Sequence, residues 1–203
     1  MAAAKRQAKE VSRRLLVEAA LESLAEKGLG AVSVRDVAMR AGVTQGLIRH
    51  HFGSFDALLE AAYRHATERV DQVLEQALDR ARGEPQARMD AFLEASFSPA
   101  IVDRRLLAAW LGFWGLVRAD PRAAAVHAET YAAYRRRIES LLDALARHRG
   151  RRVDARAGAL GLSAMLDGLW LELCLDPGTF SAEEAVGIAR AHVDNLFHAA
   201  PAV

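Results

Sequence analysis

Apolar residues recur at three- and four-residue spacing along most of this chain, which is the pattern of α-helices that bury one face. The pattern is clearest from Val11 to Ala25, and short stretches with glycine or proline interrupt it along the rest of the chain. The 203 residues include only 5 prolines, and helix-forming Ala, Leu, Arg and Glu recur throughout. We therefore expect an all-α fold of about nine helices.

The interruptions divide the chain into helical segments of very different lengths. The expected helices cover Val11–Ala25, Val34–Ala41, Gln45–Phe52, Phe55–Arg82, Gln86–Phe97, Asp103–Arg118, Pro121–Arg147, Val153–Leu175 and Ser181–Phe197. We expect a small three-helix domain over residues 1–54 and a helical bundle over residues 55–203, with the helix 55–82 as the long connection.

The second and third expected helices are short and are separated by a glycine-containing turn. Ser33 stands where an N-cap hydroxyl belongs, and Asp36, three residues on, takes the place of the usual Glu of a capping box. Gly42 permits a tight turn, and Thr44 is the next expected N-cap. This spacing is that of a helix-turn-helix.

The start of the third helix suits close approach to DNA bases. Thr44, Gln45 and Gly46 are short or polar, and Gln45 has the geometry to pair with adenine. Arg49 and His50 are expected to reach bases or phosphates, and Leu47 is either a contact to a thymine methyl group or a core residue.

Three further features bear on DNA binding. Arg35, at the front of the second helix, is placed to reach the groove or its phosphates. The N-terminus has five basic residues against Glu10, which predicts a basic, poorly structured arm that serves DNA binding or solubility; the basic residues are Lys5, Arg6, Lys9, Arg13 and Arg14. Ile48 and Phe52 are expected in the core. We expect no metal site at His50-His51, because adjacent helical residues point about 100° apart.

The first sixty or so residues resemble the DNA-binding domain of the TetR family of transcriptional repressors. The resemblance is carried by Arg14–Leu16, Val34–Ala38, Ala41–Ile48, His51–Ser54 and Leu58-Leu59. It implies a homodimer that binds a palindromic operator in double-stranded DNA and releases it when a small molecule binds. It also implies that the third helix enters the major groove, and that the second helix and the start of the fourth, at Ser54, contact phosphates.

Two residues depart from the family pattern. Arg49 stands where members usually have Tyr, and Phe55 stands where they usually have Lys. Both family residues are associated with phosphate contacts. Phe55 therefore removes one expected contact, and Arg49 replaces or strengthens another.

The second half of the chain resembles the BetI-type branch of the family, whose namesake represses genes that convert choline to glycine betaine. Ala109–Trp114 and Met165–Leu171 carry the likeness, which extends loosely over residues 86–198. All 3 tryptophans lie in these two segments. The expected effector pocket consists of Trp110, Phe113, Trp114, Asp167 and Trp170. Its rings are either a cage for a quaternary ammonium ion or plain core. Asp167 or Glu172 would supply a countercharge, and Asp167 is alternatively a structural hydrogen-bond anchor.

The last two helices are the expected dimer interface. Their small residues leave room for close helix approach; these are Ala157, Gly158, Gly161 and Ala164. For the function, the sequence leaves two alternatives to a repressor. One is a transcriptional activator of the same fold, and the other is a helical adaptor that does not bind DNA.

Other classes of function find little support in the sequence. Asp167, His127 and Cys174 form no recognisable catalytic set, so we expect neither an enzyme nor a cofactor. Cys174 is expected to be a buried structural thiol. Apolar runs such as Leu106–Val117 fall short of the roughly 18 residues of a membrane span, and the charged N-terminus is unlike a signal peptide. We therefore expect a cytoplasmic protein.

Overall fold

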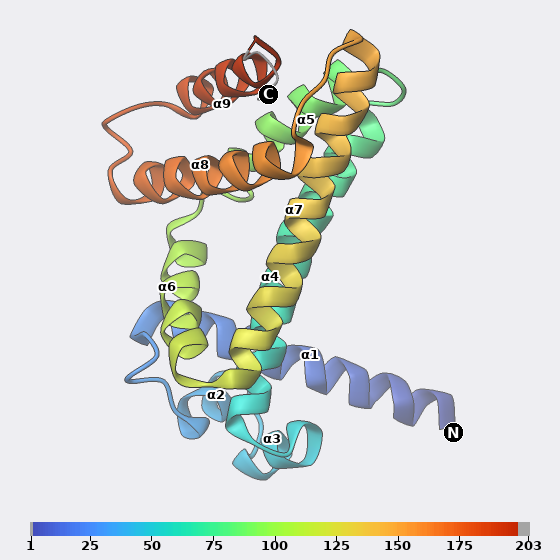
Figure 1. Cartoon of the computed structure of the whole chain (residues 1–203). Helices are drawn as coiled ribbons and strands as arrows, with labels where there is room; N and C mark the ends of the chain where they lie inside the picture. The colour runs from blue at the N-terminus through green and yellow to red at the C-terminus, as the bar shows by residue number, and fades with distance from the viewer. Residues whose placement is uncertain (1, 199–203) are drawn as a thin grey trace. The chain divides into compact units, whose positions relative to one another are not determined.

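The structure is a computed structural model that describes the backbone of residues 2–198 and the side chains of residues 10–197. Over that range it contains nine helices and no strand, which confirms the all-α prediction (Figure 1). The helices are α1 (Ala2–Lys27), α2 (Val34–Arg40), α3 (Gln45–Phe52), α4 (Phe55–Arg80), α5 (Pro85–Ser96), α6 (Arg104–Ala119), α7 (Pro121–Arg149), α8 (Ala155–Leu175) and α9 (Ala182–His198).

The N-terminal segment differs from the sequence prediction. α1 begins at Ala2, whereas the periodic pattern placed its start near Val11 and predicted a poorly structured arm before it. Residues 2–10 are Ala, Lys, Arg, Gln and Glu, all of them good helix formers, and they include no Gly or Pro. The side chains of Lys5, Arg6 and Lys9 lie outside the described residues.

The other helix ends lie within a few residues of the predicted ones, and local capping explains where α8 begins. α8 begins at Ala155 because the side chain of Asp154 accepts a hydrogen bond of 2.9 Å from the backbone N–H of Ala157. α4 ends at Arg80, two residues before the predicted end. Gly28 follows α1 with a φ of 71°, as a C-cap glycine does.

The chain forms two compact units. The first comprises residues 1–68 and 105–128, and the second comprises residues 69–104 and 129–203. The boundaries fall inside α4 and α7 and after the first residue of α6, so α4 and α7 each contribute substantially to both units. The predicted functional division at residue 54 is a different boundary, and it stays a prediction.

The core of the first unit is built on α1, α4 and α6. The side chains with no exposed surface include Leu16, Leu24, Leu58, Tyr63 and Phe113. α6 approaches α1 very closely, because a Cβ atom at Gly112 would lie 2.7 Å from Cδ1 of Leu24. Gly112 is therefore a spacing residue, and its lack of a side chain sets how near the two helices come.

In the second unit, α8 and α9 form an antiparallel pair (Figure 1). Gly158 lies at a tight contact of this unit, since a Cβ atom there would be 3.0 Å from Leu142 of α7 and 3.1 Å from Leu196 of α9. One glycine of the stripe predicted for dimer contacts therefore serves packing within the chain. Ala157, Gly161 and Ala164 remain exposed.

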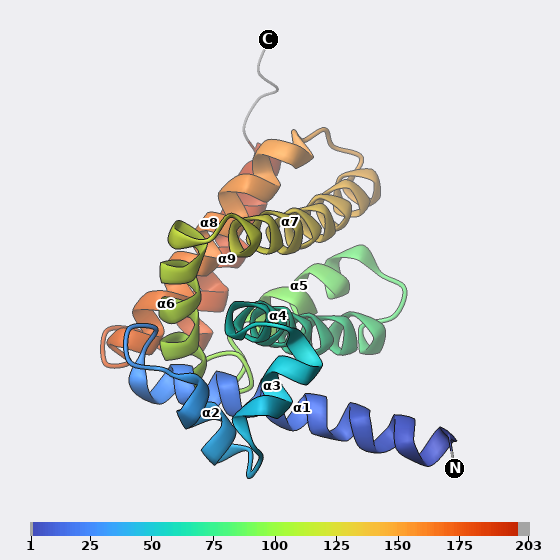
Figure 2. The same ribbon diagram turned by 90° about the horizontal axis from the view of Figure 1, so that it is seen from below.

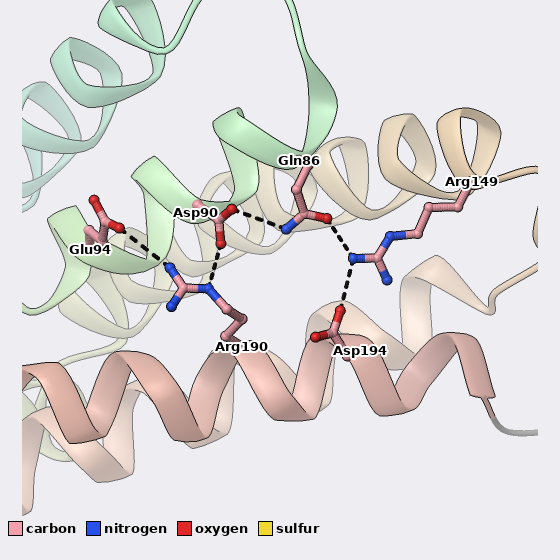
Figure 3. A network of polar contacts seen from close by, with 6 residues as sticks. All are labelled: Gln86, Asp90, Glu94, Arg149, Arg190 and Asp194. Carbon is pink, nitrogen blue, oxygen red and sulfur yellow. Dashed lines mark hydrogen bonds and ion pairs between the residues drawn. The ribbon is translucent and has the colours of Figure 1, made fainter.

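A chain of polar contacts fastens α9 to α5 and α7 (Figure 3). The Nε atom of Arg190 lies 2.7 Å from Asp90, and a second guanidinium nitrogen reaches Glu94 at 3.4 Å. Gln86 joins this pair to Arg149, which also binds Asp194 at 2.8 Å. Exposed pairs contribute little one by one, so the network orients α9 more than it stabilises the fold.

α8 is more apolar than the sequence analysis allowed. Among the described residues it is the one helix with the length and composition to cross a membrane, with a hydropathy of 1.4 over its best window. In this structure, 44% of that window is buried, and the rest is half-buried or exposed. Core helices of soluble proteins can be equally long and apolar, so the length and hydropathy of α8 are weak evidence for a membrane span.

We expect Gly112→Ala to destabilise the protein by about 1–3 kcal/mol, because the new methyl group would displace the fully buried Leu24 in a packed core. Gly46→Ala is the matched control, because a Cβ atom at this position of α3 meets nothing within 4 Å. It should raise stability by about 0.5–1 kcal/mol through helix propensity. Urea unfolding followed by circular dichroism measures both, and equal effects of the two substitutions would contradict the close contact.

Candidate DNA-binding and effector sites

The predicted capping box at the start of α2 is present and fixes this helix. Asp36 N–H donates to the Ser33 hydroxyl at 3.3 Å, and Ser33 N–H donates to the Asp36 carboxylate at 3.1 Å. Lys27, at the end of α1, binds the same carboxylate at 2.5 Å. The hydrogen bonds from Lys27 and Ser33 lower the pKa of Asp36, so this anchor stays ionised at neutral pH.

Arg40 ties the other end of α2 to α1. Its guanidinium lies 3.0 Å from Glu22 and also contacts Glu26, one turn further along α1. The hydrogen bond to Glu22 is the largest contribution to a raised pKa of Arg40. Arg40 is therefore engaged within the protein, while Arg35 on the same helix is exposed.

The turn between α2 and α3 depends on Gly42. Its φ of 66° lies in the left-handed region, where a side chain is strained. Thr44 follows as the N-cap residue of α3, as predicted, but its side chain makes no capping hydrogen bond. The hydroxyl is thus available at the exposed start of α3. Figure 2 shows α2 and α3 next to each other in this motif.

α3 has one buried side and one exposed side. Ile48 is 2% exposed and anchors the helix to the core, as predicted. Leu47 and Phe52 are half-buried, so Phe52 is less enclosed than predicted. The exposed residues form one edge of the motif: Thr44, Gln45, Gly46, Arg49 and His50. The predicted base-contacting residues are therefore accessible.

Ser54 and Met39 add detail at the margins of this edge. The Ser54 hydroxyl accepts a hydrogen bond of 3.1 Å from the N–H of Ala57, so it caps α4. Its predicted phosphate contact would come in addition to that role. Met39 lies one turn after Arg35 on α2 and is 72% exposed. Sequence reasoning missed it, although an apolar residue four positions after Arg35 was a readable signal.

α1 also borders the motif. The guanidinium of Arg13 lies 5.1 Å from the ring centre of Phe52, a cation–π contact between α1 and α3. Arg13 and Arg14 also line a groove of about 410 Å³ between α1 and α4, together with Arg64, Glu10 and Glu68. The groove mixes both signs of charge, so its lining does not select anions alone.

The predicted effector residues fall into both compact units. In the first unit, Trp110 and Phe113 pack around Tyr63, with ring centres 5.1 and 4.7 Å away. Tyr63 hydroxyl and Nδ1 of His127 are 2.7 Å apart. Phe113 has no exposed surface and Trp110 is 9% exposed, as the core interpretation predicted. Trp114 is half-buried, and a ligand contact of any of these rings stays a prediction.

In the second unit, Trp170 is also structural. Its indole N–H donates to the backbone carbonyl of Ile101 at 2.9 Å, so its polar atom is satisfied within the protein. Cys174, one turn further, is buried as predicted, and burial raises the pKa of its thiol. Asp167, one turn before Trp170, is only partly buried, and its surroundings differ from those of Trp170 and Cys174.

Asp167 lies beside two tyrosines of α7 that sequence reasoning did not single out. Tyr131 is hydrogen-bonded to the Asp167 carboxylate, and the charge of Arg135 acts on the same group. Tyr134 is hydrogen-bonded to Ser96 of α5 and packs on Phe92, with ring centres 6.0 Å apart. We call Phe92, Tyr131, Tyr134 and Asp167 the Asp167 cluster. The sequence signal for this cluster was a pair of tyrosines three positions apart in the Ala-rich first half of α7.

Burial dominates the electrostatics of this cluster. It raises the pKa of Asp167 to about 6, although the Tyr131 hydrogen bond and Arg135 both act to lower it. Burial also raises the pKa of Tyr134, so its hydroxyl stays protonated. The cluster thus combines a carboxyl group that changes charge near neutral pH with aromatic rings.

Comparison with protein families agrees with both halves of this arrangement. Residues 16–62 match the family described as bacterial regulatory proteins, tetR family. Residues 85–198 match the family described as BetI-type transcriptional repressor, C-terminal. The two matches cover the helix-turn-helix and the helices from α5 to α9.

Individual relatives support the same assignment. The HTH-type transcriptional regulator BetI of Burkholderia lata is 33% identical over 189 residues, which are 93% of this chain and 95% of the relative. A crystal structure described as a transcriptional regulator from Pseudomonas aeruginosa PAO1 has 43% identity and a TM-score of 0.86, and the match covers 92% of this chain and 90% of that one.

A more distant structure shares the fold. The regulator from Saccharomonospora viridis, crystallised in complex with choline, has 21% identity and a TM-score of 0.77, with 91% of this chain and 96% of that one covered. The sequence matches and the helix-turn-helix geometry lead to one conclusion: the chain belongs to the TetR family of bacterial transcriptional regulators and has a BetI-type C-terminal domain.

Proposed function

We propose that this TetR-family regulator is a homodimeric, cytoplasmic repressor that binds a palindromic operator through α3 and is released when a cationic small molecule binds at the Asp167 cluster. The observation that carries the DNA-binding part is the exposed edge of α3, held in place by the buried Ile48. As in its relatives, regulation of transcription is the role, and no enzymatic activity is proposed.

The chemistry of the α3 edge supports direct reading of bases. Gln45 presents an amide that matches adenine N6 and N7, and Gly46 lets the backbone approach closely. Arg49 and His50 provide donors to guanine or phosphate oxygens. Arg35 is exposed at the start of α2, where the helix dipole also favours an anion.

The exposed face of α8 and α9 supports dimer formation. Leu160 of α8 is 45% exposed and Ile188 of α9 is 46% exposed, although both are large apolar residues. Gly161, Ala164 and Ala191 lie exposed on the same two helices, where small side chains allow close approach. A second copy of the chain would bury this face by a two-fold contact.

The Asp167 cluster supports a cationic effector. A carboxylate beside the rings of Tyr131 and Tyr134 attracts a quaternary ammonium ion by charge and by cation–π contact. The choline complex of the Saccharomonospora viridis regulator makes choline the first probe. The predicted ligand contacts of Trp110, Phe113 and Trp114, which lie in the other unit, and of Trp170 stay separate predictions.

Coupling between the two sites requires two states of the dimer. Operator binding needs the two α3 helices about one DNA turn apart, roughly 34–36 Å, and the ligand would favour another separation. α4 is the proposed route, because its first residues lie in the unit with α3 and its last residues in the unit with the Asp167 cluster. An activator of the same fold would share these contacts, and reporter transcription with and without the protein separates the two.

Arg49→Ala should weaken operator binding by about 10- to 100-fold and, if Arg49 contacts phosphate, reduce the salt slope by about one. The loss follows from removing a charged donor at the exposed edge of α3. Fluorescence anisotropy with operator DNA at several salt concentrations measures both quantities. Arg147→Ala removes an exposed arginine near the end of α7 and should leave both unchanged. Full affinity of the Arg49 variant would remove this residue from the interface.

Ile188→Asp should shift the protein from dimer to monomer, with dimer affinity reduced by at least about tenfold, because it buries a charge in an apolar interface. Sedimentation equilibrium measures the change. Leu111→Asp is the control, because Leu111 is 50% exposed on α6, outside the proposed interface. A dimer that withstands the Ile188 substitution would place the interface elsewhere.

The function itself is tested by selecting operator fragments from random DNA with the pure protein and then adding choline or betaine aldehyde. We expect a ligand to lower operator affinity by about 5- to 150-fold, the usual range of allosteric coupling. Equal affinity with and without a ligand that demonstrably binds would refute release by the effector. Failure to retain any duplex at low salt would refute the DNA-binding role.

A further inference from the structure

Two groups of α7 favour the ionised form of Asp167, and burial opposes it. From α7, Tyr131 gives it a hydrogen bond and Arg135 contributes a positive charge; Arg135 also lies 6.0 Å from the Tyr131 ring centre. The charge of Asp167 also acts on Tyr134 of α7, whose own polar neighbours are Arg137 of α7 and Ser96 of α5.

These neighbours are largely committed to other contacts. Arg137 is paired with Asp71 and Glu75 of α4, at 2.7 Å each. The Ser96 hydroxyl donates to the Phe92 carbonyl at 2.8 Å, so its single proton is used and the Tyr134 hydroxyl is the donor between Tyr134 and Ser96. Among the described residues, the half-buried Asp167 therefore has the Tyr131 hydroxyl as its hydrogen-bond donor and the charge of Arg135 nearby.

Such a carboxyl group holds its proton more tightly than one in water. Burial raises the pKa of Asp167 to about 6, so near this pH the group is neutral in part of the molecules. A cation placed beside the carboxyl supplies the missing charge and favours the ionised form. Binding of the cation and loss of the proton are then linked.

We propose that the Asp167 cluster exchanges a proton for its ligand, so that the effector response depends on pH. This inference rests on the proposed cationic effector. On binding, the O–H bond of the Asp167 carboxyl breaks, the proton passes to solvent, and the electron pair stays on the carboxylate that faces the cation. The Tyr131 hydroxyl keeps its proton and donates a hydrogen bond to that carboxylate, so the net charge of the occupied site equals that of the empty, protonated one.

The link between proton loss and cation binding determines how strongly choline affinity depends on pH. With the Asp167 pKa at about 6, choline should bind about tenfold more weakly at pH 5 than at pH 8. It should release about half a proton per site near pH 6 and almost none near pH 8. The uncharged isostere of choline, with carbon in place of the ammonium nitrogen, should bind without this pH dependence.

Isothermal titration calorimetry of the whole chain measures the choline affinity and the number of protons released, in pairs of buffers with different ionisation enthalpies. Asp167→Asn should bind choline at least about tenfold more weakly at pH 8, with a flat pH profile and no proton release. Asp143→Asn, at an exposed position of α7, should match the unaltered protein. Circular dichroism and operator binding show whether each variant is folded.

Tyr131 is a positioning residue in this scheme. Tyr131→Phe removes the hydrogen bond that favours the ionised carboxylate, so the midpoint of the pH profile should move to higher pH. A purely structural role would change affinity and leave the midpoint in place. An unmoved midpoint would contradict the proposed part of Tyr131 in the exchange.

The outcomes separate the two proposals. Choline binding that weakens at low pH and releases protons near pH 6 supports the exchange. Choline binding with a flat profile and no proton release refutes the exchange and leaves the cationic effector in place. Absence of choline binding at every pH refutes the proposed effector class, and the exchange with it, while operator binding still tests the regulator.

Discussion

The burial of Ile48 is the contact on which the proposed DNA-binding surface depends. α3 has eight residues, and an isolated helix of that length is not stable in water. Its conformation comes from Ile48 in the core, from the turn at Gly42 and from α2 alongside it. Because one side of the helix is held in this way, the exposed edge, which includes Gln45, Arg49 and His50, is presented in a fixed orientation. A surface that reads bases requires such rigidity, since misplaced donors lose their partners.

Charged contacts around the motif add orientation to this apolar anchor. Lys27 and Arg40 each join α1 to α2 or its cap, and Arg13 lies over Phe52 of α3. All three are at least partly exposed, so salt screens them and each contributes little free energy. Their geometry is nevertheless directional, because a guanidinium group between two carboxylates, as at Arg40, restricts how α2 rotates on α1. The same reasoning applies to Arg190 and Arg149, which orient α9 in the second unit.

The Asp167 cluster accommodates its charge differently from the helix-turn-helix. The helix-turn-helix uses fully ionised groups at its surface, whereas the cluster holds a carboxyl whose charge is opposed by burial. A partly desolvated acid without a full ion pair is unfavourable for stability, and such groups are commonly retained for binding. Tyr131 gives it a hydrogen bond, and its charge acts on the nearby Tyr134. These features are the basis of the proposal that the site binds a ligand with its own positive charge.

The sequence by itself determined the helices, the capping box at Ser33, the turn at Gly42 and the buried side of α3, because these depend on neighbours within a few residues. It also identified the family, through motifs carried by those same local features. It misplaced the start of α1, since residues 2–10 have helix propensity but no apolar period. Only the tertiary structure brought Tyr131 and Tyr134 of α7 to Asp167 of α8, and Trp170 to the carbonyl of Ile101, 69 positions away. Contacts between distant segments depend on how helices pack, at angles and registers that no local pattern of residues specifies.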